Sequence, residues 1–527
     1  MALLAGCSGG GGGDESTRTE ISTNAIGFNA VVTDTATPTT QVFTATFGSD
    51  IAHLAVVHSG AAVADVTSTM NGRTATVTVS ATAPGTIGPG SFVGAVALTG
   101  YTCADATCSK LAAGETSTVS VNYQVSPIVQ LVTPYAETAG VADEVVIRGL
   151  GLTSFNVTGV RFGDVAATAI AIPSGSTTEI RATHPALPAG SYPVRLVASN
   201  HQGDIPTTAT LVVVDPVTYA ATTLPYPVEA TLVRGLVYDA ERRSVLVVNN
   251  TGSGTVIRYP YNGTAWGTPI SRIADYRDVA LSTKGTTLYG ITPTTFVPLD
   301  PVTLVAGTAV AAPNLAANAF LKNIVVGNDD VALITTGIDA SASTSVYFYF
   351  SLSNTVVQGG SGFNNATPAM AANGSGAYLI QGDPSLTADV QAAKYSTASN
   401  SIGSAVTSLR QNTIAPAISR TATRLVLNGT RVYDAAEAFL GTLPATTAAV
   451  ALKADGSRAY TYDPTAGGIL VFDVSVDRDE AAYAALGAVV PVAGDPGANP
   501  KMILSPDGRT LFLAGGTQLV VQPTPAL

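Results

Sequence analysis

Apolar and polar residues alternate along the first quarter of the chain. Four runs show this period of two, at residues 41–47, 73–80, 91–98 and 117–123, and Gly, Pro and Asn separate them. Such alternation is typical of antiparallel strands with one buried and one exposed face. The pattern predicts a β-sandwich over residues 20–125, with a turn at residues 83–90.

A second segment, residues 126–215, carries short motifs with glycine-marked turns. The motifs are Val132-Thr-Pro134, Gly140, Val145-Val-Ile-Arg-Gly-Leu-Gly151, Val160-Arg-Phe-Gly-Asp164, Thr178-Glu-Ile-Arg181, Pro185 and Ala189-Gly-Ser-Tyr-Pro-Val-Arg195. On these motifs the segment from residue 127 resembles an IPT/TIG domain, an Ig-like module of bacterial surface proteins and of some transcription factors. The resemblance implies a spacer or binding platform without catalysis. Two successive Ig-like sandwiches are therefore expected.

A repeat of apolar strand, turn and second apolar strand fills residues 216–527. The second strand of each copy opens at Val245, Leu288, Val331, Ala377, Leu425, Ala459 and Leu511. This spacing is close to the ~40–50 residues of a propeller blade. The segment resembles the YVTN/WD40-like seven-bladed propellers of exported bacterial proteins.

Two details of this ring are also predicted. A strand near residues 217–225 is expected to complete the last blade and close the ring. The longest interval between copies contains residues 477–486, which are rich in helix formers and predict a one-helix insertion.

Composition narrows the class of protein. A length of 527 residues predicts about three or four domains. Charged residues make up 12% of the chain, half of the ~25% of an average soluble protein. The net charge of −11 would repel a phosphate backbone, which excludes nucleic-acid binding. The predicted fold class is all-β: two Ig-like β-sandwiches followed by a seven-bladed β-propeller.

The first 19 residues are expected to be a tether. The run Leu3-Leu-Ala-Gly-Cys7, followed by Ser8 and by glycines at positions 9–13, resembles a bacterial lipobox. The resemblance implies a lipid on Cys7, a flexible tether and, since Ser8 is not aspartate, the outer membrane with a periplasmic or cell-surface orientation. Only six residues precede Cys7, so most of a signal peptide is missing from this sequence, through a start assigned too late or through trimming. A free cysteine is the alternative.

Cys103 and Cys108 are separated by four residues, a loop that can bring the two sulfurs together. In an exported protein this spacing predicts a disulfide bond. A metal site is the competing interpretation, but the four histidines show no spacing around the pair that suits a metal. Neither a metal nor a cofactor is expected.

The propeller sequence offers few candidate catalytic groups. All four histidines precede residue 216, which excludes a histidine-based metal centre or a Ser-His-Asp triad there. A carboxylate pair drawn from Asp275, Asp278, Asp329 and Asp330 stays possible, although turn aspartates are common between strands. No catalytic residue is assigned, and an enzyme is the less favoured class.

The order of stalk and head favours a non-catalytic surface lipoprotein that presents its propeller to a protein or glycan partner. Two alternatives stay open: an extracellular propeller enzyme of lactonase or lyase type, and a structural subunit of an envelope assembly. Trp266, Tyr259 and Tyr261 could stack on sugar rings. A locally basic and polar set enters the innermost strands and is the candidate binding face; its members are Arg234, Arg277, Asp278, Lys322, Asn323 and Lys501. Pairing of these residues across neighbouring blades is the competing interpretation.

Overall fold

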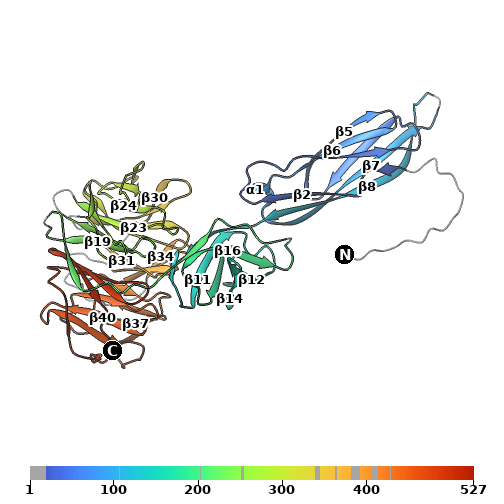
Figure 1. The fold of residues 1–527 in the computed structure, drawn as a ribbon. Coiled ribbons are helices and arrows are strands. Elements are labelled where there is room, and N and C mark those ends of the chain that lie inside the picture. The colour runs from blue at the N-terminus through green and yellow to red at the C-terminus, as the bar shows by residue number, and fades with distance from the viewer. Residues whose placement is uncertain are drawn as a thin grey trace.

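The computed structural model describes residues 19–105, 107–201, 203–228, 230–250, 254–338, 345–361, 365–380, 392–404, 414–427 and 429–526. Cys7 and the glycine run lie outside these residues. The chain forms a first sandwich, a second sandwich and a propeller, arranged in a row (Figure 1). The first two form an elongated stalk, and the propeller forms a broader head at the far end.

The first sandwich consists of two four-stranded sheets. One has the order β1-β3-β6-β5 and the other β2-β8-β7-β4. The strands are β1 (Glu20–Ile21), β2 (Ala25–Val31), β3 (Gln41–Thr46), β4 (His53–Ser59), β5 (Val63–Asn71), β6 (Thr74–Ala81), β7 (Gly90–Cys103) and β8 (Leu111–Ser126). All four alternating runs predicted from the sequence lie in this set. The strict alternation of β6 between buried and half-buried residues shows why the pattern was readable.

The segment predicted as a turn at residues 83–90 contains one short helix, α1 (Pro84–Ile87). Proline at its first position favours helix initiation, and Gly88 ends the helix with a φ of +75°. The structure also forms the disulfide bond between Cys103 and Cys108 at the end of β7. The bond closes a small loop at one tip of the sandwich.

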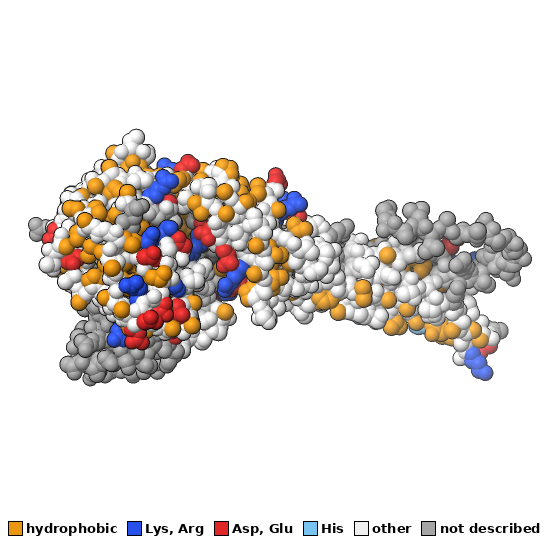
Figure 2. All heavy atoms as spheres, turned by 90° about the horizontal axis from the view of Figure 1, so that it is seen from below, with side chains coloured by type: hydrophobic (Ala, Val, Ile, Leu, Met, Phe, Trp, Pro, Cys, Tyr) orange, Lys and Arg blue, Asp and Glu red, His pale blue; other side chains and the backbone are white. Residues whose placement is uncertain are grey.

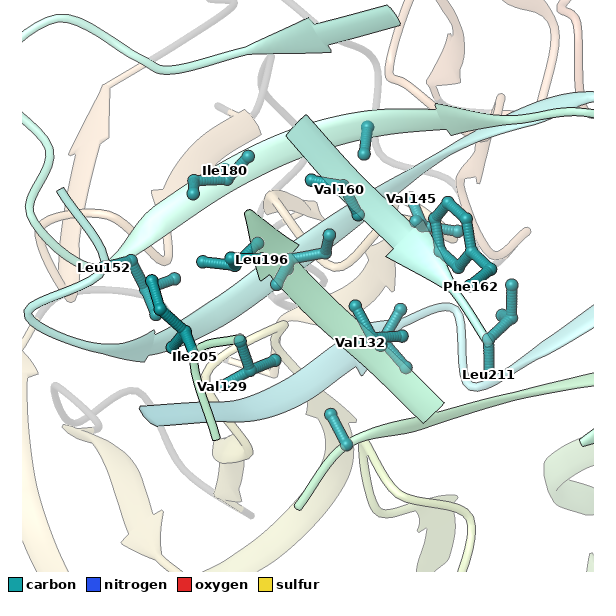
Figure 3. Close-up of a cluster of buried hydrophobic side chains, with 14 of the residues drawn as sticks. Val129, Val132, Val145, Leu152, Val160, Phe162, Ile180, Leu196, Ile205 and Leu211 are labelled. Atoms are coloured by element: carbon teal, nitrogen blue, oxygen red, sulfur yellow. The ribbon is translucent and has the colours of Figure 1, made fainter. Parts of the chain in front are cut away.

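The second sandwich packs two sheets of orders β10-β17-β16-β12-β13 and β14-β15-β11-β9. The strands are β9 (Ile128–Thr133), β10 (Ala136–Thr138), β11 (Asp143–Leu150), β12 (Val157–Phe162), β13 (Val165–Ala166), β14 (Ala169–Ala171), β15 (Glu179–His184), β16 (Gly190–Ala198) and β17 (Thr210–Val214). Aliphatic side chains from both sheets surround Phe162, which is fully buried (Figure 3). Gly163 follows with a φ of +60°, so the glycine is required at this turn.

The head is a ring of seven four-stranded sheets. Their innermost strands are β19 (Val233–Asp239), β23 (Asp278–Leu281), β27 (Ala319–Val326), β31 (Thr367–Met370), β35 (Ala417–Ile418), β39 (Ala449–Leu452) and β43 (Lys501–Leu504). Each contacts the innermost strand of the next blade, and β43 contacts β19, which closes the ring. We number the blades 1 to 7 in this order.

The second strand of every blade lies where the repeat predicted it. These strands are β20 (Ser244–Asn249), β24 (Leu288–Ile291), β28 (Val331–Ile338), β32 (Gly376–Ile380), β36 (Arg424–Leu427), β40 (Arg458–Asp463) and β44 (Thr510–Ala514). Their described apolar side chains are buried between neighbouring blades, for example Val245 and Leu511. The periodic signal is strongest here because both faces of these strands are apolar.

The two outer strands complete each blade. The third strands are β21 (Thr255–Pro260), β25 (Thr295–Leu299), β29 (Ser345–Phe350), β33 (Ala392–Ser396), β37 (Arg431–Asp434), β41 (Gly468–Asp473) and β45 (Gln518–Pro523). The outermost strands are β22 (Ile270–Ile273), β26 (Val310–Ala311), β30 (Thr355–Ser361), β34 (Ser401–Ser404), β38 (Phe439–Thr442), β42 (Val490–Pro491) and, in blade 7, β18 (Thr222–Pro225). β18 pairs antiparallel with β45, so the predicted closing strand is confirmed.

The helix predicted over residues 477–486 is wrong. This segment is irregular, with one turn at residues 479–480, and two of its residues form isolated bridges, Ala482 with Thr442 and Ala485 with Phe472. The phenol of Tyr483 is buried against blade 5 and donates to the Val476 carbonyl at 2.9 Å. Tertiary contacts to two blades therefore outweigh the helix propensity of its alanines.

Candidate functional site

The candidate binding residues gather at one end of the innermost strands. Arg234, Asp278 and Lys501 each stand at or next to the start of such a strand, in blades 1, 2 and 7. Lys322 and Asn323 lie within β27 of blade 3, and Arg277 precedes β23. We call Arg234, Arg277, Lys322 and Lys501, with Asp275 and Asp278, the basic mouth. Its four basic and two acidic side chains give a formal excess of two positive charges.

The second sandwich contacts the opposite face of the propeller. Within β19, Arg234 at the basic mouth and Asp239 at the strand's other end are five residue steps apart, a distance of about 17 Å. There the Tyr135 hydroxyl of the second sandwich donates to Asp239 Oδ1 at 2.8 Å. Arg242 donates to Asp239 Oδ2 and to the Gly285 carbonyl, both at 2.9 Å. The turns between the first and second strands of the blades therefore form the stalk side.

A second ionic contact fixes the same interface from blade 5. Arg420, in the turn before β36, binds both carboxylate oxygens of Glu137 and lies 2.9 Å from Asp143 Oδ2. Arg420 and Glu137 are buried. Burial raises the pKa of Glu137, and the guanidinium opposes that effect by stabilising the carboxylate. These contacts could not be predicted from the sequence, because charged residues so far apart in the chain carry no local signal of burial.

A channel of about 470 Å³ follows the axis of the ring between these two faces. Asp278 and Lys501 are the only charged residues among its described lining, which is otherwise mostly aliphatic, as with Val279, Ile324 and Met370. Met370 also lines a smaller cavity of about 240 Å³, whose other wall is formed by Thr133, Pro134 and Tyr135. The second sandwich thus lies over the stalk-side end of the channel.

Several residues of the basic mouth bridge neighbouring blades. Arg234 donates to the Tyr276 carbonyl of blade 2 at 3.3 Å. Asp278 accepts the N–H of Ile324 in blade 3 at 3.1 Å. Lys322 donates to the carbonyl of residue 365, on the approach to blade 4, at 2.5 Å. Pairing across neighbouring blades, the competing interpretation, therefore holds for Arg234, Asp278 and Lys322.

Asn323 completes the same pattern. Its amide donates to the Ala366 carbonyl at 2.9 Å, and the Thr335 hydroxyl donates to the same carbonyl at 2.8 Å. Asn323 is buried. Its amide is therefore used in joining blades 3 and 4.

The side chains of Arg277 and Lys501 make few polar contacts with the described residues. The Arg277 guanidinium lies 3.6 Å from the Asp275 carboxylate and stacks over the Phe320 ring. The Arg234 guanidinium also lies 3.6 Å from that carboxylate. The Arg277 Nε atom is buried without a hydrogen-bond partner in the described part of the chain. The Lys501 side chain makes no hydrogen bond or ion pair to any described residue, and it is half-buried at the channel wall.

Burial changes the acidity of two groups here. It raises the pKa of Asp278 to about 6, an effect that Lys501 and two backbone N–H donors oppose. It lowers the pKa of Lys322 to about 8, and the nearby charge of Lys501 adds to that decrease. Both pKa shifts indicate surroundings of low dielectric constant, in which a charged ligand would interact strongly with these side chains.

The four aspartates considered as a carboxylate pair do not gather. Asp329 and Asp330 lie in the β27–β28 turn on the stalk side, whereas Asp275 and Asp278 lie at the basic mouth. Asp330 accepts the N–H of Thr283 at 2.8 Å, and Asp329 accepts the N–H of Val331 at 3.1 Å. These aspartates therefore stabilise turns.

The aromatic residues considered for sugar stacking pack against one another. Trp266 lies 5.2 Å from Tyr261 and 4.9 Å from Tyr219, measured between ring centroids. Tyr259 is buried, and its hydroxyl donates to the Pro225 carbonyl at 2.9 Å. The cluster joins blade 1 to the strand that closes blade 7.

Figure 2 shows charged side chains gathered on the propeller, while most of the visible stalk surface is uncharged. Among the described residues no group of His, Cys, Asp and Glu side chains could hold a metal ion. Nor does the described part of the chain contain a helix of the length and hydrophobicity that would cross a membrane.

Comparison with known proteins identifies one part of the chain. Residues 127–213 match the IPT/TIG domain family, which agrees with the sandwich seen there. Among solved structures the chain is similar to the Kuenenia stuttgartiensis hydrazine synthase, with a TM-score of 0.43 and 12% identity, covering 57% of this chain and 98% of that one. No curated protein sequence matches. The chain is thus an all-β protein with an IPT/TIG domain between an Ig-like sandwich and a propeller.

Proposed function

We propose that this protein is a non-catalytic surface lipoprotein whose stalk holds the propeller so that the basic mouth can bind an anionic group of a partner protein or glycan. The observation that carries the proposal is the placement of the IPT/TIG domain on the opposite face, where Tyr135 and Arg420 attach it. Loops on the far face of a rigid scaffold are common sites of recognition.

The chemistry of the basic mouth favours an anion. Arg277 and Lys501 offer donors that the described protein groups leave largely unused. A carboxylate, sulfate or phosphate group could accept hydrogen bonds from them, and such charge-assisted bonds are among the strongest. Arg234 and Lys322 would add to the positive potential while still joining blades, and this potential would mainly speed encounter.

The test uses the full chain with dextran sulfate as the anionic probe and uncharged dextran as its control. Binding to dextran sulfate is expected at low salt and should weaken as salt screens the charges. A variant with Arg234, Arg277 and Lys501 all changed to Glu is expected to lose binding. The double variant Arg277→Gln and Lys501→Gln should lose most of it without adding repulsive charge.

A matched control changes charge on the stalk side. Lys284 and Arg509 are exposed in turns of blades 2 and 7. Changing both to Glu should leave dextran sulfate binding intact, because neither contributes to the basic mouth. Equal binding by the parent chain and the triple variant at low salt would overturn the proposal.

Anchoring is proposed through a lipid on Cys7 at the outer membrane. The lipobox resemblance and the glycine run that follows it support this placement. Labelling cells with a radioactive fatty acid should mark the parent chain and leave a Cys7→Ser variant unmarked. Equal labelling of both would contradict the lipid assignment.

A further inference from the structure

The first sandwich exposes an unpaired strand edge. β2 pairs in parallel with β8 on one side, and no other described strand pairs with it. In a parallel pair of strands, every second residue directs both its N–H and its C=O groups toward the partner strand, and the residues between direct theirs away from it. The Ser120 N–H donates to the Asn24 carbonyl at 3.0 Å, and the Val32 N–H donates to the Ser126 carbonyl at 2.9 Å. Even-numbered residues therefore face β8, and odd-numbered residues direct their backbone groups outward.

Gly27 and Asn29 form the free part of this edge. Beyond them the chain covers its own backbone, because the Val31 N–H donates to Asp34 Oδ2 at 2.8 Å and the Asp34 N–H donates to the Val31 carbonyl at 2.9 Å. The N–H and C=O groups of Gly27 and Asn29 have no hydrogen-bond partner within the described residues. Both residues are exposed.

The same edge opens into a groove of about 620 Å³. Residues 27–30 form one wall, and residues 34–39 with Gln41 form the other. Asp34 is the only ionisable residue in this lining, which otherwise contains three threonines. An extended chain laid along β2 would bond to Gly27 and Asn29 while its alternate side chains enter the groove.

The sequence of β2 leaves this edge unprotected. Natural sheets usually shield their edges with lysine, proline or a bulge. β2 reads Ala-Ile-Gly-Phe-Asn-Ala-Val, without a charge or a proline, and its pairing with β8 is continuous in register over all seven residues. Such an edge can accept a further strand.

We propose that this edge binds an extended peptide segment of a partner protein by strand addition. The segment would carry small or β-branched side chains and a basic residue facing Asp34. A peptide fits better than a second copy of this chain, because each copy has a net charge of −11 and would bring a second Asp34 to the groove. The inference concerns the first sandwich alone and does not depend on what the basic mouth binds.

The probe is a labelled peptide of sequence Thr-Val-Thr-Val-Lys-Val-Thr, and the control is a version in which the second and third valines are replaced by proline. The full chain is expected to bind the first peptide with a Kd of about 1 mM or tighter, and not the second. Hydrogen exchange followed by NMR should show new protection of the Gly27 and Asn29 amides. The Ile26 and Phe28 amides, which face β8, supply an internal control and should not change.

Two variants test the edge independently of each other. Asn29→Pro removes an outward N–H and leaves the ladder with β8 intact, since proline is tolerated on a free edge. Gly27→Lys adds a side chain whose Cβ meets only the Asn122 carbonyl oxygen, at 4.0 Å, and it repels a basic peptide. Each should weaken binding about tenfold or more. Val93→Lys, at a position 72% exposed on β7 outside the groove, should have no effect.

Three results would overturn the proposal. The first is peptide binding that both groove variants leave unchanged. The second is the absence of exchange protection at Gly27 and Asn29. The third is a concentration-dependent dimer, seen by light scattering, that Asn29→Pro abolishes while no peptide binds, which would assign the edge to a second copy.

Discussion

Replacing Gly285 with alanine is expected to destabilise the junction between stalk and head. Gly285 lies in the turn between β23 and β24 with a φ of +67°, which costs an L-residue roughly 1–2 kcal/mol. A Cβ atom there would lie 2.5 Å from the ring of Tyr135. That ring is half-buried, and the hydrogen bond from its hydroxyl to Asp239 leaves it little room to move. Overpacking typically costs about 1–3 kcal/mol. The expected loss in the free energy of unfolding is about 2–5 kcal/mol.

Gly508 supplies the matched control. It occupies the corresponding turn of blade 7, between β43 and β44, with a φ of +71°. A Cβ at this position would meet no atom within 4 Å. Gly508→Ala therefore carries the backbone cost alone. The difference between the two variants isolates the contact with Tyr135, about 1–3 kcal/mol.

The assay is a double-mutant cycle measured by calorimetry on the transition of the propeller. In a Tyr135→Ala background the excess cost of Gly285→Ala should vanish, because the ring that the new methyl group would strike is absent. Equal losses for the two glycine variants in the parent chain would refute the predicted clash. So would an excess that persists after the ring is removed.

Three further predictions concern buried or linked groups. Because burial raises the pKa of Asp278 to about 6, above the ~3.9 of an unfolded aspartate, the parent should lose stability relative to Asp278→Asn as pH rises from about 4 to about 6. The difference, measured by urea unfolding, should be on the order of 2 kcal/mol, and identical pH profiles would contradict it. Arg420→Ala leaves the Glu137 carboxylate buried without its cation, so it should cost about 3–5 kcal/mol at pH 7; because burial raises the pKa of Glu137, the cost should decrease as the pH falls and the carboxylate takes up a proton. Mass spectrometry of exported protein should find Cys103 and Cys108 disulfide-linked, and free thiols at both positions would contradict the bond seen here.

The strands of the propeller could be predicted because they repeat. Positions such as Val245 and Leu511 are the first or second residue of a buried strand in every copy, and the same apolar pattern recurs at each interface between blades. The segment 477–486 was mispredicted because local propensity favours a helix, while bridges to Thr442 and Phe472 decide its conformation. Such contacts connect residues that are far apart or belong to different blades.

The position of the candidate site could be predicted from the sequence, but the hydrogen-bond partners of its side chains could be predicted only in part. Counting from the repeat placed Arg234, Asp278 and Lys501 at the starts of innermost strands. It could not show that both oxygens of Asp278 accept backbone N–H groups: Val279 is its neighbour in the chain, but Ile324 is brought to it only by the packing of blade 3 against blade 2. The groove beside β2 could not be predicted from the sequence either, because an alternating pattern does not show which strand lies at the edge of a sheet.

The strand that closes the ring also decides how the head would respond to mechanical tension. A pull along the stalk enters the propeller through the linker before β18, whose four residues bond to β45 at the far end of the chain. Since β18 and β45 pair antiparallel at the rim of blade 7, such a force acts on the first strand of the head and is transmitted through their hydrogen bonds to the last strand. The contacts of Tyr135 with blades 1 and 2, and of Glu137 with Arg420 in blade 5, offer a parallel route for the same force. The stalk is thus secured to the head at separate points around the ring, and tension is shared among several blades.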